Sequence, residues 1–277
     1  MVDSSLPVSA PLSAPAARAA AAPRRMTGAL WPRVICGIAI MALWEGVVRL
    51  LAPAYVAKPT GILLAIPHVM SDPAFLGATG ITLLACAEGL AIALVFGTLL
   101  GLWMGRSTMA DKLLRHYVNG FYAVPMVVAV PLFALWFGYT GAARLATIVF
   151  SSLFSIIVNV SDGARSVPKD YLEVARSFRA PRLPVLIEIV LPAATPYFLA
   201  GLRLAAGRAL IGAVVAEFLT AVAGVGYFIL YQSRVFHHNE AFVGVLLLAA
   251  FGIGFDILVN WSTRRFLPWY RRDEASE

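Results

Sequence analysis

Long apolar runs separated by short polar stretches occupy most of this chain. Six of them are long enough to cross a membrane, because about 20 apolar residues in a helix span the hydrocarbon core of a bilayer. They cover residues 32–51, 79–104, 117–138, 144–161, 193–219 and 241–262. The pattern predicts an all-α polytopic membrane protein, with six transmembrane helices in a domain of residues 31–265.

One polar stretch between these runs, residues 163–192, carries two short helical stripes of apolar residues. The first stripe is Tyr171, Leu172, Val174, Ala175 and Phe178, and the second is Leu183, Leu186, Ile187, Val190 and Leu191. Proline disfavours the helical conformation of the residue before it, so Ala180 is expected to end the first helix. Pro181 then suits an early position in the second helix. The stretch therefore predicts two amphipathic helices that meet at a sharp bend and offer an apolar edge to a partner.

Composition agrees with the hydrophobic pattern. The 277 residues are 60% hydrophobic and 13% charged, with a mean hydropathy of +0.80. The net charge of +7 follows from topology: with both termini inside, sixteen of the 22 basic residues fall in predicted cytoplasmic segments. Only Lys58, Arg144 and Arg234 fall in external ones. The positive-inside rule therefore places both termini and residues 163–192 in the cytoplasm, and no nucleic-acid partner is needed to explain the charge.

The two ends of the chain are predicted to be cytoplasmic tails, residues 1–30 and 266–277. Residues 1–25 are mainly Ala, Pro, Ser and Arg, and such a composition buries too little apolar surface to fold. The apolar core of a signal peptide is also missing there. Cys36 and Cys86 both lie in apolar runs, so no disulfide framework is expected.

The polar stretch carries a motif that resembles the EAA motif of ABC importer permeases. That family has Glu-Ala-Ala, a glycine four residues after the second alanine, and Ile-x-Leu-Pro ten residues beyond the glycine. The matching positions here are Glu173, Val174, Ala175, Ile189, Leu191 and Pro192. Val174 replaces the first alanine, and Arg179 stands where the glycine usually does. Because a side chain resists the turn that glycine makes, we expect Pro181 to supply part of the bend.

Other segments resemble the nitrate/sulfonate/taurine branch of these permeases, so the resemblance runs from about residue 40 to 265. It implies an inner-membrane transport subunit, not an enzyme, without a cofactor of its own. It also implies three protein partners: a separate ATP-binding ABC subunit, a periplasmic solute-binding protein and a second permease copy in a homodimer. The residues implied in ATPase docking are Glu173, Val174, Ala175, Phe178, Arg179, Ile189, Leu191 and Pro192. The P-loop pattern G-x-x-x-x-G-K-[ST] is missing from the sequence, which agrees with a separate ATPase.

Prolines and charges within the apolar runs are candidates for the translocation path. Pro125 and Pro131 bend the third run, either as a packed kink, which is favoured, or as a broken helix that lines the path. Arg208 is the residue best placed to meet an anionic solute, although an internal ion pair with Glu88 or Glu217 is favoured. Glu217 is itself a second candidate for the path.

The remaining charged residues in the runs have structural explanations. Glu45 and Arg49 are spaced to neutralise each other on one helix. Arg203 can extend its long side chain toward the cytoplasmic surface. With Arg208, Arg203 favours an anionic solute, although the solute's identity is left open.

Small, aromatic and histidine residues also receive structural interpretations first. Gly97, Gly101 and Gly105 recur every four residues, which favours close helix packing over a role in lining the path. Trp31, Trp103, Trp136 and Trp261 fall near span ends, as in an interfacial aromatic belt, next to membrane lipid. The polar segment 237–240, with two adjacent histidines, is expected to be a docking surface for an external partner and not a metal site.

Two other classes of protein stay open at this point. A secondary transporter or channel would not need the two-helix loop, and it usually shows internal hydropathy repeats that this sequence lacks. A membrane-embedded enzyme would need polar residues clustered at one depth, and here they are scattered. The prediction is therefore an ATP-driven importer permease that works by alternating access.

Overall fold

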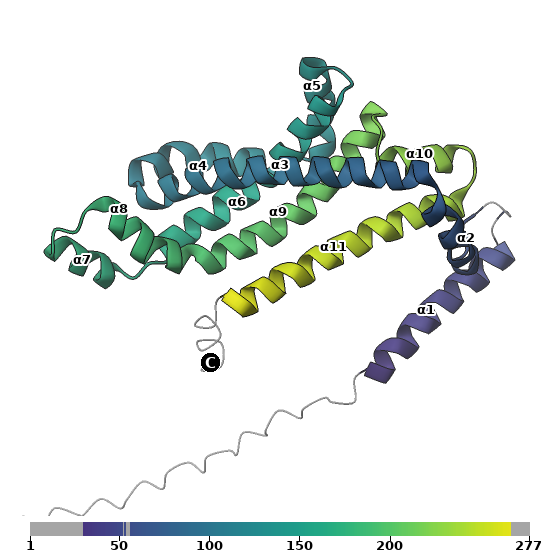
Figure 1. Cartoon of the computed structure of the whole chain (residues 1–277), viewed down its shortest axis with the longest axis horizontal. Helices are drawn as coiled ribbons and strands as arrows, with labels where there is room; N and C mark the ends of the chain where they lie inside the picture. The colour runs from purple at the N-terminus through teal and green to yellow at the C-terminus, as the bar shows by residue number, and fades with distance from the viewer. Residues whose placement is uncertain (1–29, 52, 54–55, 267–277) are drawn as a thin grey trace, which may run out of the picture. The chain divides into compact units, whose positions relative to one another are not determined.

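The computed structural model describes residues 30–51, 53 and 56–266, and within that part every regular element is helical (Figure 1). Residues 30–43 and residues 44–266 form two separate units. Helix α1 (Leu30–Leu51) crosses the division between them. The predicted tails lie outside the described residues, except that Leu30 and Phe266 are the ends of described helices.

The helices after α1 all belong to the larger unit. They are α2 (Pro59–Ser71), α3 (Pro73–Arg106), α4 (Thr108–Ala123), α5 (Met126–Phe137), α6 (Gly141–Arg165), α7 (Lys169–Ser177), α8 (Arg182–Pro184), the π-helix η1 (Val185–Val190), α9 (Leu191–Thr220), α10 (Val225–Arg234) and α11 (His238–Phe266). Short polar residues begin several of them. The side chain of Asp72 accepts a hydrogen bond from the Ala74 N–H at 2.9 Å, and that of Ser107 accepts one from the Ala110 N–H at 3.2 Å. Such caps satisfy N–H groups that have no partner within the helix.

Five helical stretches are long and apolar enough to cross a membrane. They are Trp31–Leu51, Pro73–Arg106, Gly141–Arg165, Arg182–Thr220 and His238–Thr263. Helices α4 and α5 would make a sixth span together, but they are bent by 100° at the break between them. The structure therefore agrees with the predicted polytopic helical protein, and it corrects the third span, which is two helices.

Helices α3, α6 and α9 pack side by side at the centre of the larger unit (Figure 1). The glycines of α3 face α6: a β-carbon added at Gly101 would lie 2.8 Å from Cβ of Val160 and 2.9 Å from the carbonyl oxygen of Ile157. Gly97 and Gly105 approach α6 equally closely. The prediction that these glycines serve helix packing is confirmed, because a side chain at any of them would force the two helices apart.

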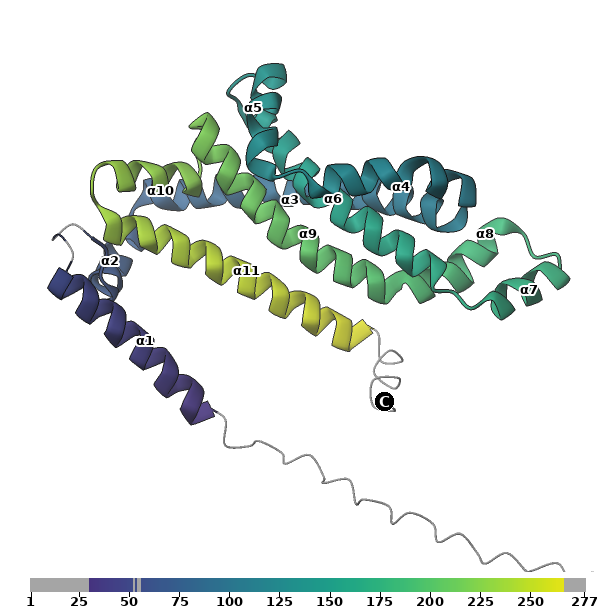
Figure 2. The same cartoon turned by 180° about the vertical axis from the view of Figure 1, so that it is seen from behind.

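The hydrophobic pattern did not predict two of the helices, α2 and α10. Both lie near the N-terminal end of α3. They pack with α11 around a shared apolar core that includes Ile62, Phe75 and Ile229. Helix α11 also runs along α9 (Figure 2). The side chains of Trp103, Trp136 and Trp261 are exposed, as the predicted aromatic belt requires.

Candidate functional site

The loop that the sequence predicts to dock an ATPase, residues 163–192, is called the docking loop below. It contains α7, an amphipathic helix that ends at Ser177. The chain then turns through the left-handed conformation at Arg179, whose φ is 50°. The Ala180 N–H donates to the carbonyl of Ala175 and the Arg179 N–H donates to the carbonyl of Arg176, both at 2.9 Å. This pair of bonds is the Schellman motif, which satisfies the last carbonyl groups of a helix.

Arg179 itself therefore makes the bend that the sequence assigned in part to Pro181. The helix ends at Ser177 and not at the predicted Ala180, because the Schellman bonds close it before the restriction imposed by the proline takes effect. Pro181 is extended and lies just before α8, not within it. A side chain in the left-handed region costs roughly 1–2 kcal/mol, so the bend is strained where glycine would not be.

One face of the docking loop is apolar and exposed. The side chains of Val174 and Phe178 are 56% and 82% exposed, and Leu183 and Ile187 are exposed beyond the bend. Glu173 is exposed on the same helix. Large apolar side chains on a surface indicate a site for a protein partner or for the membrane.

The opposite face of the docking loop packs against the membrane helices. Leu172 and Ile189 lie against a buried cluster of Ala164, Val167 and Val190, and Ala175 is partly buried. The loop is therefore seated on the end of α6 and on the start of α9.

Beyond Pro181 the loop continues into the membrane without a break, because α8, η1 and α9 form one helical stretch. The Leu191 N–H donates to the Leu186 carbonyl, five residues back, as in a π-helix. Pro192 follows in the first turn of α9, and its ring would clash with a carbonyl four residues back in a regular α-helix. The wide π turn accommodates this proline at the junction between loop and span, and π turns are frequent at functional sites.

The break in the third span lies at Pro125, which precedes the first residue of α5. Figure 1 shows α5 turning away from the line of α4. Pro131 lies inside α5 and is exposed, without ending the helix. The sequence left two interpretations of this segment open, a kink in one continuous helix and a broken helix. In the structure the helix is broken, because α4 ends before Pro125 and α5 begins after it.

Arg208 lies against this break. Its guanidinium carbon is 4.1 Å from the centre of the Tyr122 ring, a cation–π contact. A cavity of about 240 Å³ adjoins the pair, with Phe150 and Phe154 in its wall. Within the described chain no carboxylate contacts Arg208, so the predicted ion pair is not formed.

Glu217 is fully buried and its partner is Arg144 of α6, not Arg208. One carboxylate oxygen lies 3.3 Å from Nη1 of Arg144 and accepts a hydrogen bond from the Thr82 hydroxyl at 2.8 Å. The other oxygen accepts from the Gly226 N–H at 2.8 Å. Nη1 of Arg144 also donates to the carbonyl of Ala223 at 2.7 Å. These contacts favour a structural role for Glu217 over the predicted one in the path.

The segment between α9 and α10 fits closely around this carboxylate. A β-carbon added at Gly224 would overlap the carboxyl group of Glu217, and one at Gly226 would lie 2.9 Å from its Oε2 atom. The Thr82 hydroxyl also accepts a hydrogen bond from the Val225 N–H at 2.9 Å. Thr82, Arg144 and Glu217 therefore fasten residues 223–226 to α3, α6 and α9, respectively.

Two further ion pairs involve ionisable residues of the spans, and one of them was predicted. Nε of Arg49 lies 2.5 Å from a carboxylate oxygen of Glu45, which confirms that pair. The other oxygen of Glu45 accepts from the Thr60 N–H at 3.0 Å, so the pair also anchors the start of α2. Arg203, for which an extension toward the cytoplasmic surface was predicted, instead has its Nε atom 2.8 Å from a carboxylate oxygen of Asp256 in α11.

The polar segment 237–240 is held by contacts within the chain. The side chain of Asn239 accepts from the Lys58 N–H at 3.1 Å and packs against Gly61. Nδ1 of His237 lies 2.8 Å from Glu240. Asn239 therefore joins the start of α11 to α2, a structural role beside the predicted docking surface.

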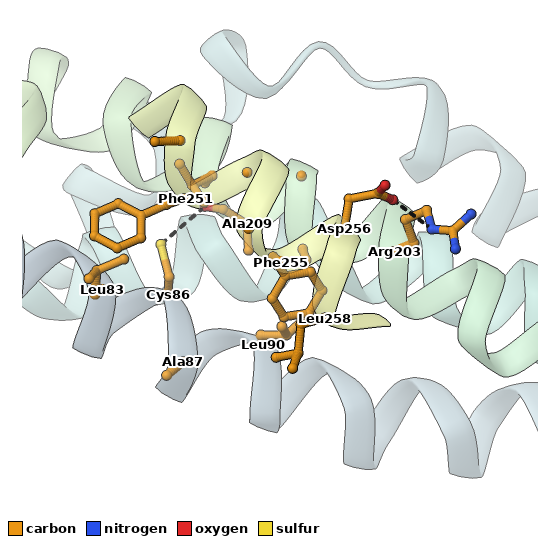
Figure 3. A pocket seen from close by; sticks show the side chains of 16 residues that line it. Leu83, Cys86, Ala87, Leu90, Arg203, Ala209, Phe251, Phe255, Asp256 and Leu258 are labelled. Atoms are coloured by element: carbon orange, nitrogen blue, oxygen red, sulfur yellow. Dashed lines mark hydrogen bonds and ion pairs between the residues drawn. The ribbon is translucent and has the colours of Figure 1, made fainter. Parts of the chain in front are cut away.

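A second cavity, of about 520 Å³, lies between α3, α9 and α11. Figure 3 shows Phe251 and Phe255 in its wall and the Arg203–Asp256 pair at one end. Sγ of Cys86 lies 3.8 Å from the carbonyl oxygen of Ala209. Because its only charged side chains neutralise each other, the described lining offers an anion no free cation.

Two residues of the site, Arg144 and Tyr122, could not be assigned their partners from the sequence. Arg144 stood at the edge of a predicted span, with nothing to connect it to Glu217 more than 70 residues later. Tyr122 lay inside a run that was read as one helix, so its side chain had no predicted partner. Only the glycines that follow Glu217, at positions 224 and 226, hinted at a closely packed segment.

The comparisons place this architecture in a known class. The sequence profile of the family described as the binding-protein-dependent transport system inner membrane component matches residues 93–272. This is well over half of the chain, and the chain belongs to that family. It is the permease subunit of an ABC importer, a membrane subunit that does not hydrolyse ATP, and the ATPase is a separate subunit.

Two similar proteins have names that match the predicted nitrate/sulfonate/taurine branch. The putative aliphatic sulfonates transport permease protein SsuC of Bacillus subtilis (strain 168) is 29% identical over 246 residues, which cover 88% of this chain and 87% of that one. The nitrate import permease protein NrtB of Synechococcus elongatus (strain ATCC 33912 / PCC 7942 / FACHB-805) is 27% identical over 253 residues, covering 87% of this chain and 88% of that one.

Solved structures share the fold. The bacterial ABC transporter involved in the import of the acidic polysaccharide alginate has a TM-score of 0.62 at 14% identity, covering 87% of this chain and 95% of that one. An inward-facing form of the MetNI methionine ABC transporter has a TM-score of 0.61 at 17% identity, covering 71% of this chain and 99% of that one. Membership of this family excludes the alternative left open by the sequence, a secondary transporter or channel, and the shared fold agrees with this conclusion.

Proposed function

We propose that this permease moves a small anion into the cytoplasm, and that Arg208 binds the anion on its way. The observation that carries the proposal is the state of Arg208: it stacks on Tyr122 beside the broken third span and has no carboxylate partner within the described chain. A charge inside a membrane span is expensive unless it is paired or faces a polar cavity. A transported anion would supply the missing charge.

The broken helix favours the same assignment. Irregular backbone at membrane depth is tolerated where it is buried in protein or lines a cavity, and the cavity beside Arg208 lies at the break. Relatives named for sulfonates, nitrate and bicarbonate handle anions, whereas one named for formylaminopyrimidine does not. The argument for an anionic solute therefore depends on Arg208. The names of the relatives are consistent with an anion but do not decide the question.

The docking loop is proposed to bind the ATPase through its exposed face, around Glu173, Val174 and Phe178. Its opposite face is seated on α6 and α9, and its second half continues into α9 as one helical stretch. A movement imposed by the ATPase on the exposed face would reach the membrane through that stretch. In this way Ile189, Leu191 and Pro192 join the loop to the span that carries Arg208.

A second copy of the chain is proposed to complete the pathway. Glu88 is exposed near the middle of α3, within an otherwise apolar span. An ionisable side chain that faced lipid there would be costly, so a protein surface or a water-filled path must cover it. A homodimer that encloses the path between two copies supplies such a surface.

The docking loop and both termini are proposed to be cytoplasmic, because most basic residues fall in those segments.

The test is uptake of candidate anions by cells or proteoliposomes that contain the permease with its ATPase and binding protein. Arg208→Ala should reduce uptake about 10- to 150-fold, the equivalent of one hydrogen bond to a charged group at about 1.5–3 kcal/mol. Tyr122→Leu should also reduce uptake, because it removes the ring that positions the guanidinium.

Tyr122→Phe is the matched control, because it keeps the ring and removes only the hydroxyl, and its uptake should stay near that of the wild type. Membrane insertion and co-purification of the ATPase should be unchanged in all three variants. Normal anion uptake by Arg208→Ala would remove Arg208 from the path and, with it, the main reason to propose an anion.

A further inference from the structure

Four arginine side chains line one cavity beneath the docking loop. The cavity has a volume of about 760 Å³ and is bounded by α3, α7, α8 and η1. Its basic residues are Arg106, Arg176, Arg179 and Arg182. The described lining contains no acidic residue, so the cavity has a formal charge of +4.

These arginines differ from their neighbours in having no ion pair. Arg115 lies 2.9 Å from Asp111, and Arg165 pairs with the same carboxylate. None of the four cavity arginines contacts a carboxylate in the part of the chain that the structure describes. Within this group, Nη1 of Arg106 donates a hydrogen bond of 3.5 Å to the carbonyl of Ala164. Four like charges around one cavity repel each other, and a bound anion would relieve that repulsion.

The remaining lining residues indicate where this anion comes from. Trp103 lies one turn before the end of the apolar helix α3 and is 56% exposed. The apolar side chains of Val185, Leu186 and Val190 form another wall, just before the apolar span of α9 begins. A tryptophan beside a basic cluster at the ends of two spans is typical of the boundary between lipid headgroups and acyl chains. A freely dissolved anion would make no use of the apolar wall.

We propose that this cavity binds the headgroup of an anionic phospholipid from the cytoplasmic leaflet. The phosphate would lie among the arginines, and the start of the acyl chains would lie against Trp103 and the apolar wall. The proposal rests on the cytoplasmic orientation of the docking loop and is independent of the transported solute. A lipid in this place would join α3 to the docking loop, since Arg106 belongs to α3 and the other three arginines belong to the loop.

Bound ATPase need not compete for the same site. The apolar side chains assigned to ATPase docking, Val174 and Phe178, do not line the cavity, whereas Ala175 and Arg179 do. Three of the cavity arginines, Arg106, Arg176 and Arg182, are outside the set of docking residues, and of these Arg106 and Arg182 also lie outside α7. They are therefore the positions at which a lipid site and an ATPase site can be told apart.

The experiment measures phosphatidylglycerol bound to the purified wild-type permease by native mass spectrometry, during titration into detergent. Each arginine near an anionic headgroup contributes about 1 kcal/mol. The double variant Arg106→Gln/Arg182→Gln should therefore bind phosphatidylglycerol about 30-fold more weakly. Lys112→Gln is the matched control: Lys112 is an exposed basic residue of α4 that does not line the cavity, and its removal should leave binding unchanged.

Two further measurements separate the sources of the anion and guard against misfolding. Inorganic phosphate should not displace phosphatidylglycerol, and displacement at equal concentration would overturn the lipid assignment in favour of a soluble anion. Arg106→Lys/Arg182→Lys, which keeps the charge, should restore most of the binding. The proposal is also overturned if the double glutamine variant keeps the lipid and loses the ATPase on co-purification, because the arginines would then belong to the ATPase interface.

Discussion

The buried carboxylate of Glu217 gives the sharpest prediction about stability. Glu217→Ala removes the ion pair with Arg144 and the hydrogen bonds with Thr82 and the Gly226 N–H. It also leaves Arg144, whose side chain is 11% exposed, with only the Ala223 carbonyl as a partner. Breaking a buried pair by removing one partner costs about 3–5 kcal/mol. Because Arg144 keeps one partner and slight exposure, we expect about 3 kcal/mol.

The assay is the free energy of unfolding of the purified permease in mixed micelles titrated with sodium dodecyl sulfate. Glu217→Gln should lose somewhat less, about 2 kcal/mol, because the amide oxygen still accepts on one side while the NH2 group meets a hydrogen-bond donor on the other. Adding Arg144→Ala to Glu217→Ala should cost less than the sum of the two single changes, because neither partner is then left unpaired.

Glu188→Ala is the control for this series, since Glu188 is exposed on η1 and has no ion pair within the described residues. It should change the free energy of unfolding by less than about 0.5 kcal/mol. The reasoning would be refuted if Glu217→Ala were as mild as Glu188→Ala, or if the Glu217 and Arg144 changes were simply additive.

Two further predictions concern the helix contact and the bend. Gly101→Leu should destabilise the permease by several kcal/mol in the same titration, since its side chain would meet Val160 and the Ile157 carbonyl; a neutral effect would contradict the close packing of α3 on α6. Arg179→Gly should slow amide hydrogen exchange at Ala180 by relieving about 1 kcal/mol of backbone strain, and Arg179→Val should accelerate it; equal exchange in both variants would contradict the left-handed bend.

Much of the fold could be predicted because membrane spans follow from composition and length alone. The apolar runs located five continuous spans, and the four-residue spacing of Gly97, Gly101 and Gly105 indicated the face of α3 that packs closely. The third span was predicted as continuous because hydrophobicity does not report the direction of a helix. Pro125 marked the break, but a proline can equally produce a kink in a continuous helix.

The docking loop was predicted in outline and differed in its bend. The two stripes located α7 and the helix that follows, and the motif placed Arg179 at the bend. That an arginine adopts φ of 50° there could not be inferred, because its strain is offset by two backbone hydrogen bonds that only the structure shows. The pairing of charges was harder still: Glu217 meets Arg144 and not Arg208, and that depends on how α6 rotates against α9.

The strain at Arg179 also bears on coupling. Strained backbone persists where the surrounding structure holds it, and such positions cluster at switch regions. Here it lies between α7, on which Val174 and Phe178 are exposed, and the helical stretch that continues into α9. The bend is therefore the point at which we expect a movement of the ATPase to change the angle between the two halves of the loop.

The most direct test of the coupling account is co-purification of the detergent-solubilised permease with its ATPase. The wild type should retain the ATPase. Glu173→Ala and Arg179→Glu should lose it, because both change the docking loop, whereas Arg208→Ala should retain it, because that change lies in the membrane. Retention of the ATPase by both loop variants would contradict the account, since the exposed face of α7 and the bend at Arg179 would then not be the docking site.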